Sequence, residues 1–301
     1  MQAKLFFRNL LSFLLILVLL DFLIGNALRY FYFRIKVGQY AETTYVLNTV
    51  DKDLLVFGSS RATHNFSSEI FEREWGPSFY NVGSDGQGVF YHYAVLRSIL
   101  KKHSPKVIIL SMDFLEFDRS REGYDRLSKL LPYYRSHKEI RSIISFKSNF
   151  EKFKMFSQIY PFNSMILNIA ADSIKMTKQS DRGYIPLDGR WKAPLEKKEF
   201  KETAMDKAKI KVYQDFIAQA VHSGAHVFVI VAPYYINFDY ANSSTLKLAS
   251  LIAKSNGAVF IDYSQDSYFL CHPELFDDPY HLNDEGAKIF TKMVISAVKR
   301  T

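Results

Sequence analysis

The sequence holds a single cysteine, Cys271, among 301 residues. One cysteine excludes an intrachain disulfide and any metal site built from several cysteines, and we expect Cys271 to be a buried structural thiol. Internal repeats, low-complexity tracts and nucleic-acid-binding motifs are also missing, although the net charge is +8. Because the basic residues are spread along the chain, the expected partner is a membrane surface or an anionic polymer, and not nucleic acid.

The N-terminus carries the longest apolar run, from Leu10 to Ile24, and its flanks bring it to about the length that spans a bilayer as a helix. Lys4 and Arg8 precede the run, and no small-x-small cleavage site follows, so we predict an uncleaved membrane anchor. Basic residues on both sides leave its orientation open. Asp21 lies inside the run, where a carboxylate either reaches water at the interface or docks to a membrane partner.

Beyond the anchor, 48% hydrophobic residues are enough for a packed core. Apolar stretches that end at glycine or polar residues alternate with stretches of helical periodicity. We predict strands over 53–58, 78–83, 107–110, 226–231 and 258–262, and helices over 66–75, 89–103, 243–255 and 284–299. This alternation predicts an α/β fold: a doubly wound, flavodoxin-like parallel sheet of about five strands with flanking helices.

The predicted organisation has three parts. Residues 1–36 form the membrane anchor and its flanks, residues 37–52 a tether without clear periodicity, and residues 53–301 the α/β domain. From about 115 to 203 the alternation breaks down into a helical insert rich in tyrosine, phenylalanine and lysine. Such an insert either caps a ligand site or adds a packing layer.

The turn Gly58-Ser59-Ser60-Arg61 follows the first predicted strand. Open α/β sheets bind ligands at the carboxyl ends of their strands, so this turn is placed for chemistry. Either serine becomes a nucleophile if a base arrives from elsewhere in the chain. Arg61 is expected to bind an anionic group of a substrate or to form a salt bridge with the insert.

Asp278 and His281 stand just before the last predicted helix. A carboxylate three residues ahead of a histidine can bind the imidazole Nδ1 and leave Nε2 free, which gives the orienting group and the base of a serine triad. Asp277 is the alternative orienting group. His64 is the alternative base, because it lies one helical turn after Ser60.

This order of elements and motifs resembles the SGNH (GDSL-like) hydrolase superfamily over the chain beyond the tether. The serine of the family's first block corresponds to Ser60, the glycine of its second block to Gly83, and the aspartate-x-x-histidine of its last block to Asp278 and His281. The third block differs from that of the family, because the segment 111–115 reads Ser-Met-Asp-Phe-Leu and lacks the family's asparagine.

The resemblance implies a triad of Ser60, His281 and Asp278 with no metal or cofactor. It also implies that the backbone N–H groups of Ser60 and Gly83 stabilise the oxyanion. The glycine-serine-serine form and the single anchor resemble the membrane-anchored branch, which includes the D-alanyl transfer protein of teichoic acid synthesis and the alginate O-acetylation proteins.

That branch implies a serine-dependent O-acyltransferase or esterase that acts on acylated cell-surface polysaccharide or a related polymer. Its catalytic domain would face the periplasm or the cell exterior, and its anchor helix would meet a membrane partner in acyl transfer. The alternative is a non-catalytic polymer-binding or assembly protein on the same fold, which the missing third-block asparagine and the aromatic insert favour.

Overall fold

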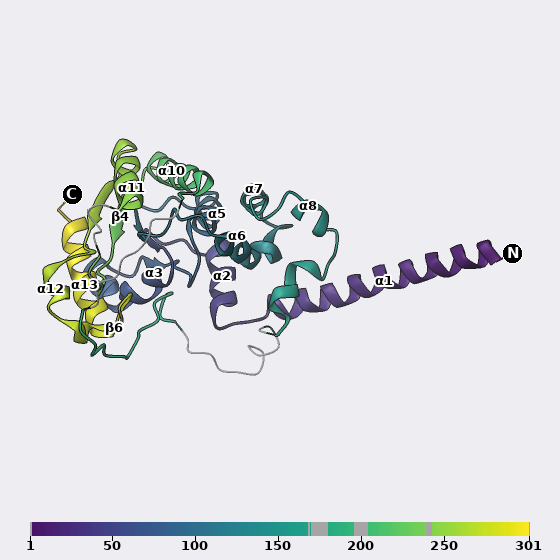
Figure 1. The fold of residues 1–301 in the computed structure, drawn as a ribbon, viewed down its shortest axis with the longest axis horizontal. Coiled ribbons are helices and arrows are strands. Elements are labelled where there is room, and N and C mark those ends of the chain that lie inside the picture. Colours follow the sequence, from purple (N-terminus) through teal and green to yellow (C-terminus); the bar gives the residue numbers. More distant parts are fainter. Residues whose placement is uncertain (1, 168, 170–179, 196–203, 239–242, 301) are drawn as a thin grey trace. The chain divides into compact units, whose positions relative to one another are not determined.

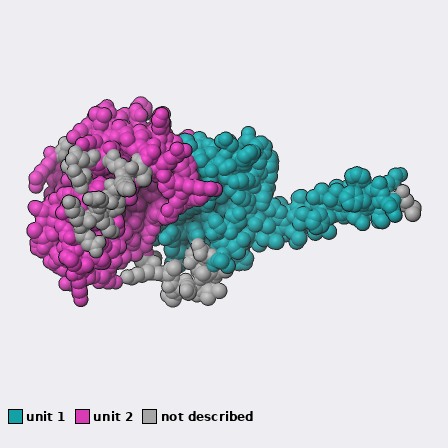
Figure 2. All heavy atoms as spheres, in the orientation of Figure 1, with its two compact units in different colours: residues 1–44, 127–178 teal, residues 45–126, 179–301 magenta. Residues whose placement is uncertain are grey.

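The computed structural model describes residues 2–167, 169, 180–195, 204–238 and 243–300 (Figure 1). The chain divides into two compact units (Figure 2). Unit 1 comprises residues 1–44 and 127–178, and unit 2 comprises residues 45–126 and 179–301.

Unit 2 is built around five parallel strands in the order β2-β1-β3-β4-β5. Leu54 pairs with Phe79 on one side and with Val107 on the other, which fixes the register of the three strands nearest the Gly58 turn. The strands are β1 (Leu54–Phe57), β2 (Phe79–Asn81), β3 (Val107–Ser111), β4 (His226–Val231) and β5 (Val259–Asp262). This sheet confirms the predicted doubly wound α/β fold, because its strand order is that of flavodoxin-like proteins.

Helices cover both faces of the sheet. Side chains alternate along β1, so Val56 joins the core with Phe290 of the last helix, whereas Phe57 meets Phe216 on the opposite face. The helices of unit 2 beyond the boundary helix α2 are α3 (Ser60–Asn65), α4 (Ser68–Trp75), α5 (Val89–Leu100), α6 (Arg121–Asp125), α10 (Lys207–His222), α11 (Ser244–Ser255), α12 (Ser267–Leu270) and α13 (Asp284–Val298).

Three local features differ from what the sequence led us to expect. The segment without clear periodicity, predicted as a tether, contains the helix α2 (Gln39–Asn48). Helix α10 occupies a stretch for which we predicted no element. Cys271 is exposed just after α12, so the prediction of a buried thiol is wrong.

Unit 1 joins the N-terminal helix to most of the described part of the predicted insert. Its α1 (Gln2–Tyr32) is long and apolar enough to cross a membrane. The insert contributes η1 (Arg126–Tyr133), η2 (Lys138–Ile140), α7 (Arg141–Ile144), α8 (Glu151–Lys154) and η3 (Tyr160–Met165). The Tyr133 hydroxyl binds the Tyr32 hydroxyl at 3.1 Å and the Thr44 hydroxyl at 2.6 Å. The insert thus packs on the N-terminal helices, an association that the sequence did not predict.

The turn after β1 depends on a glycine. Gly58 has a φ of +143°, and a Cβ built on it would lie 2.8 Å from both Cβ and O of Ser111. Backbone strain and steric overlap therefore both oppose a side chain at this position.

We expect Gly58→Ala to lower the free energy of unfolding of unit 2 by about 3 kcal/mol or more. Gly76→Ala is the matched control, because Gly76 has a φ of +111° but no atom within 4 Å of the position that a Cβ would occupy. It should cost only about 1 to 2 kcal/mol. Both tryptophans, Trp75 and Trp191, lie in unit 2, so their fluorescence in urea reports its unfolding. Equal losses for the two variants would contradict the steric argument.

Candidate active site

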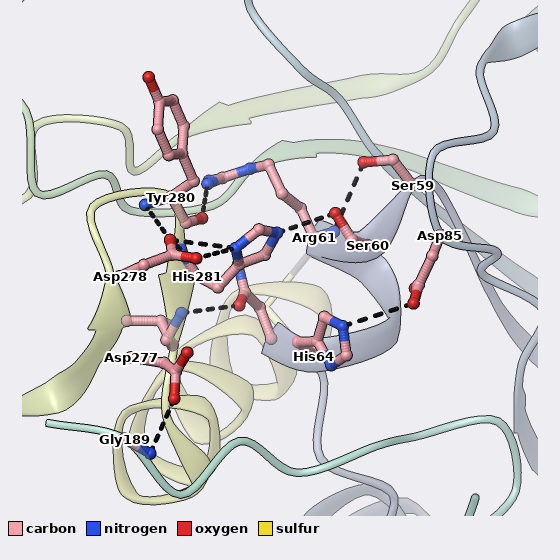
Figure 3. Close-up of polar contacts among 12 residues, drawn as sticks. Ser59, Ser60, Arg61, His64, Asp85, Gly189, Asp277, Asp278, Tyr280 and His281 are labelled. Atoms are coloured by element: carbon pink, nitrogen blue, oxygen red, sulfur yellow. Dashed lines mark hydrogen bonds and ion pairs between the residues drawn. The ribbon is translucent and has the colours of Figure 1, made fainter. Parts of the chain in front are cut away.

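Ser60 stands at the start of α3, directly beyond the turn that ends β1. Ser59 caps this helix in an extended conformation, and its Oγ accepts a hydrogen bond from the Arg61 backbone N–H at 3.4 Å. The Ser60 hydroxyl points away from the helix toward the imidazole of His281, with 2.8 Å between Oγ and Nε2 (Figure 3). The structure thus brings together two of the residues that the sequence singled out.

Asp278 binds the other nitrogen of the same imidazole. Its Oδ2 lies 2.9 Å from His281 Nδ1, and its Oδ1 accepts the backbone N–H groups of Tyr280 at 2.7 Å and of His281 at 2.9 Å. Burial, the largest influence, raises the pKa of Asp278, but these hydrogen bonds and the imidazole together hold it below its usual value. A carboxylate on Nδ1 keeps the proton there, so Nε2 is free to accept the Ser60 hydroxyl proton.

A short hairpin and a helix cap hold Asp278 and His281 in place. The strands β6 (Phe276–Asp278) and β7 (His281–Leu282) pair antiparallel, with Asp278 opposite His281. Asn283 then caps α13, because its Oδ1 accepts the Gly286 N–H at 3.0 Å. The two catalytic candidates on this hairpin are therefore fixed by backbone pairing on one side and by a helix start on the other.

The two alternatives from the sequence have other partners. Asp277 accepts the Gly189 N–H at 2.7 Å and does not contact the imidazole of His281. His64 binds the Ile185 carbonyl through Nδ1 at 2.7 Å, and its ring packs edge-on against that of His281 at 5.6 Å. Neither side chain completes a relay with Ser60.

His64 forms an ion pair of its own. Its Nε2 lies 3.7 Å from Asp85 Oδ2. Burial, the largest influence, lowers the pKa of His64, but the contacts with Asp85 and with the Ile185 carbonyl outweigh it and raise the pKa overall. The His64 ring thus lies beside that of His281, although the two rings exchange no hydrogen bond.

Arg61 is buried, and both terminal nitrogens of its guanidinium are bound by protein groups. Its guanidinium donates to the carbonyls of Tyr280, Ala232 and Pro233. It also stacks on the Tyr234 ring, with 3.4 Å between Cζ and the ring centroid. These contacts join the loop after β4 to the hairpin that carries His281. The structure thus binds the Arg61 guanidinium to the protein's own carbonyls, and the substrate-binding role of Arg61 stays a prediction.

The two backbone N–H groups expected to stabilise the oxyanion differ in whether they already have a hydrogen-bond acceptor. Ser60 is the first residue of α3, where a backbone N–H has no acceptor within the helix. The Gly83 N–H, in contrast, donates to Asn81 Oδ1 at 3.0 Å. Gly83 nevertheless approaches α3 closely, because a Cβ there would lie 2.8 Å from that of Ala62. Asp113, in the third block, holds a local turn by accepting the Leu115 N–H and offers no donor as a carboxylate.

An open cavity of about 330 Å³ adjoins the Ser60 hydroxyl. It lies where the strand order reverses between β1 and β3, which is the usual ligand position in doubly wound sheets. Five ionisable side chains and a single aliphatic one face it. The lining residues are Ser59, Ser60, Gly86, Gln87, Gly88, Asp113, Leu115, Glu116, Ser120, Glu122, Gly123, Arg126 and Lys209. The ionisable side chains of this lining can form hydrogen bonds with a hydrophilic ligand.

Glu116 is a titratable member of this lining that the sequence gave no reason to select. Its Oε1 accepts the Val89 N–H at 2.7 Å, at the start of α5. Burial raises the pKa of Glu116 to about 7, although the Val89 N–H and the charge of Lys209 act in the opposite direction. Within the described ranges, no group of three or more histidine, cysteine or acidic side chains is placed to hold a metal ion.

We expect the buried guanidinium of Arg61 to stabilise the fold because it donates hydrogen bonds to three carbonyl groups at once. Arg61→Lys keeps the charge but cannot reach three carbonyls, so the free energy of unfolding should fall by about 2 to 4 kcal/mol. Arg73→Lys, an exposed position on α4, is the control and should stay within about 0.5 kcal/mol of the wild type. Tryptophan fluorescence in urea measures both, and similar values for the two would contradict this role.

The raised pKa of Glu116 makes stability depend on pH in a defined direction. Folded Glu116 releases its proton near pH 7, whereas the ordinary value is 4.5. Its contribution is therefore complete below the ordinary value and is lost as the pH rises through about 7. Between about pH 5 and about pH 8 we expect the wild type to lose roughly 1 to 3 kcal/mol that Glu116→Gln retains. Glu122→Gln should keep the wild-type slope, and a Glu116→Gln slope equal to it would contradict the assignment.

Comparisons with known proteins return remote similarity only. Neither a protein-family model nor a curated protein matches the chain. The solved structure of YxiM from Bacillus subtilis is similar over 83% of this chain and 56% of its own length, with 13% identity and a TM-score of 0.41. A Streptococcus pneumoniae protein provisionally described as a platelet activating factor is similar over 92% of this chain and 96% of its own, with 13% identity and a TM-score of 0.40. The chain thus spans little more than half the length of YxiM.

Proposed function

We propose that the chain is a membrane-anchored, serine-dependent O-acyltransferase or esterase that acts on acyl groups of a cell-surface polysaccharide or related polymer. One observation carries the proposal: the continuous hydrogen-bonded relay from Ser60 Oγ through the His281 imidazole to Asp278. This order of nucleophile, base and orienting carboxylate is that of serine-dependent acyl transfer. The resemblance of the motifs to SGNH hydrolases points to the same chemistry.

In the first half of the reaction, Ser60 Oγ attacks the carbonyl carbon of the acyl donor while its proton passes to His281 Nε2. The negative charge that develops on the carbonyl oxygen is stabilised by the Ser60 N–H. A typical donor of this kind lowers the barrier by about 3 kcal/mol. The tetrahedral species collapses when the imidazolium returns the proton to the leaving alcohol, which leaves the acyl group as an ester on Ser60.

In the second half, His281 removes a proton from the acceptor hydroxyl, which attacks the Ser60 ester. The bond between Ser60 Oγ and the acyl carbon then breaks, and the imidazolium returns the proton to Ser60 Oγ. Water as the acceptor gives hydrolysis, and a sugar hydroxyl gives transfer. The cavity beside Ser60 supports a polyhydroxylated acceptor, because five ionisable side chains of its lining offer hydrogen-bond donors and acceptors. The low pKa of Asp278 keeps its carboxylate ionised at neutral pH, where it balances the imidazolium in both halves.

The length and apolar composition of α1 support the anchor in this proposal. Attachment to a membrane would hold the enzyme near polymers at the cell surface. The acyl donor, the polymer and a membrane partner in acyl transfer remain parts of the proposal.

We expect the full-length chain in detergent to hydrolyse p-nitrophenyl acetate and to react with a serine-directed fluorophosphonate. Ser60→Ala and His281→Gln should lower kcat/KM by at least about 10³-fold and abolish labelling, because the nucleophile or its base is lost. Asp278→Asn should lower it by about 10²- to 10⁴-fold. Asp277→Asn and His64→Gln are the matched controls and should retain labelling at Ser60.

Labelling that persists in Ser60→Ala, or the absence of turnover in the wild type, would contradict an enzymatic function. The second result would favour a polymer-binding protein instead. One observation favours that alternative, namely the Gly83 N–H that is already bound to Asn81. Mass spectrometry of oligosaccharides incubated with an acetyl ester then separates transfer from hydrolysis.

A further inference from the structure

Asp21 joins α1 to the insert within unit 1. Its two carboxylate oxygens accept the Ser157 hydroxyl at 2.5 Å, the Gln158 N–H at 2.7 Å and the Ile159 N–H at 3.3 Å. The carboxylate of the apolar run thus has hydrogen-bond partners within the chain itself. It binds the chain's own backbone just before η3.

Close packing reinforces this junction one helical turn later. A Cβ on Gly25 would lie 2.2 Å from that of Gln158, so the helix surface touches the insert backbone directly. Arg135 holds the same segment from the other side, through the Gln158 side chain and the Met155 carbonyl at 2.7 Å. The segment from Met155 to Ile159 is therefore fixed on α1 at the level of Asp21 and Gly25.

The position of this junction along α1 corresponds to a membrane surface. From Leu5 to Ile24 the helix is mostly exposed and sixteen of its twenty residues are apolar, and at 1.5 Å per residue these turns cover about 30 Å, the thickness of a hydrocarbon core. Asp21 and Gly25 lie at the end of that span. A segment bound to them lies where acyl chains meet polar head groups.

The residues just before this junction expose large aromatic side chains. Phe150 is 66% exposed and Phe156 is 79% exposed, and Phe146 and Phe153 are exposed as well. The buried Met155 lies between them and faces the interior of unit 1. We call Phe146, Phe150, Phe153 and Phe156 the Phe face. Several exposed phenylalanines so close in sequence are unusual on a surface that meets only water.

The charges beside the Phe face have one sign. Lys152 and Lys154 are exposed next to Phe153 on α8. Glu151 is the only acidic residue between 141 and 160, and it is buried, where it accepts the Tyr160 hydroxyl at 2.7 Å and pairs with Lys154. Phenylalanine mixed with lysine is the composition of segments that lie in a membrane interface and attract anionic head groups.

We propose that the Phe face inserts into the lipid head-group region beside α1, with Lys152 and Lys154 against anionic lipid phosphates. The part of unit 1 that carries the Phe face then lies on the membrane surface as a platform, in addition to the attachment by α1. The occupant is lipid, because the segment that follows the Phe face is bound to α1 at the end of its apolar span, and the exposed Lys152 and Lys154 complement anionic lipid. This inference rests on the anchor in the proposed function and is independent of the serine chemistry.

The experiment measures how deep the Phe face lies in the bilayer. Binding of the chain to vesicles would not be informative, because a spanning helix alone keeps the chain in the bilayer. The full chain with Cys271→Ser is reconstituted into vesicles of phosphatidylcholine and phosphatidylglycerol. An environment-sensitive NBD fluorophore is attached to Phe150→Cys, Phe153→Cys or Phe156→Cys, one at a time. Quenching is compared between a lipid with a doxyl group near the head group and aqueous iodide. Leu251→Cys in unit 2 is the matched control, since Leu251 is 66% exposed like Phe150.

We expect the labels on the Phe face to lose most of their emission to the doxyl lipid, to shift to the blue and to resist iodide. The Leu251 label should show the reverse. Labels on the Phe face that behave like the Leu251 label would overturn the proposal, and so would labels shielded from both quenchers, which would indicate a protein partner. A Leu14→Cys label on α1 tests separately whether α1 spans the bilayer. If lipids with a deep doxyl group quench this label while the Phe face stays accessible to iodide, α1 is an anchor but the Phe face does not insert into the membrane.

Charge reversal tests the lipid contact directly. Lys152→Glu together with Lys154→Glu should reduce doxyl quenching of the Phe156→Cys label and increase its quenching by iodide. Lys292→Glu on α13 is the control for charge alone and should leave both unchanged. If the double variant retains the full protection from iodide, the lysines do not contact anionic lipid and that part of the proposal is wrong.

Discussion

The hydrogen bond between Ser60 and His281 joins residues 221 positions apart in the sequence. It exists because parallel strands end at a common edge of the sheet, so the turn after β1 and the hairpin before α13 meet there. Arg61 adds a constraint, since its guanidinium binds the Tyr280 carbonyl on the hairpin and the Ala232 carbonyl after β4. The distance between nucleophile and base is thus set by the sheet, by the turn at Gly58 and by one buried arginine together.

The fold was predictable because most strands of the sheet are short apolar runs with a clear end. Strand β4 begins and ends at the predicted residues, and α13 begins where Asn283 and Asp284 provide a helix start. The contact between Asp278 and His281 was predictable from the sequence for a similar reason. The two residues are only three positions apart, so a hairpin is enough to bring their side chains together. Choosing Ser60 over Ser59 depended on the resemblance to a family, and the structure now explains the difference, since Ser59 serves as the helix cap.

The remaining features depend on contacts between distant segments, for which the sequence carries no periodic signal. In the sequence, Arg61 resembles a surface cation beside a nucleophile. In the structure, the loop after β4 binds its guanidinium. Nothing in the sequence indicates that the Gly83 N–H donates to the Asn81 side chain. Nor does the sequence distinguish Glu116 from the other acidic residues, because its contact with the start of α5 depends on the fold. Asp21 was expected to find water or a foreign partner, because nothing in residues 157–159 marks them as its ligands.

Most single-pass anchors are interchangeable: any apolar helix of sufficient length holds the attached domain at a membrane. The first helix of this chain, the anchor of our proposal, is not interchangeable in this way, because Asp21 and Gly25 contact the backbone around Gln158, and Tyr32 is part of the interior of unit 1. Replacing this helix with a generic one, or removing it by proteolysis, would expose part of the interior of a folded unit. The proposed anchor is consequently also part of the tertiary structure of unit 1, and a fragment made by deleting it would lack one side of an interior surface.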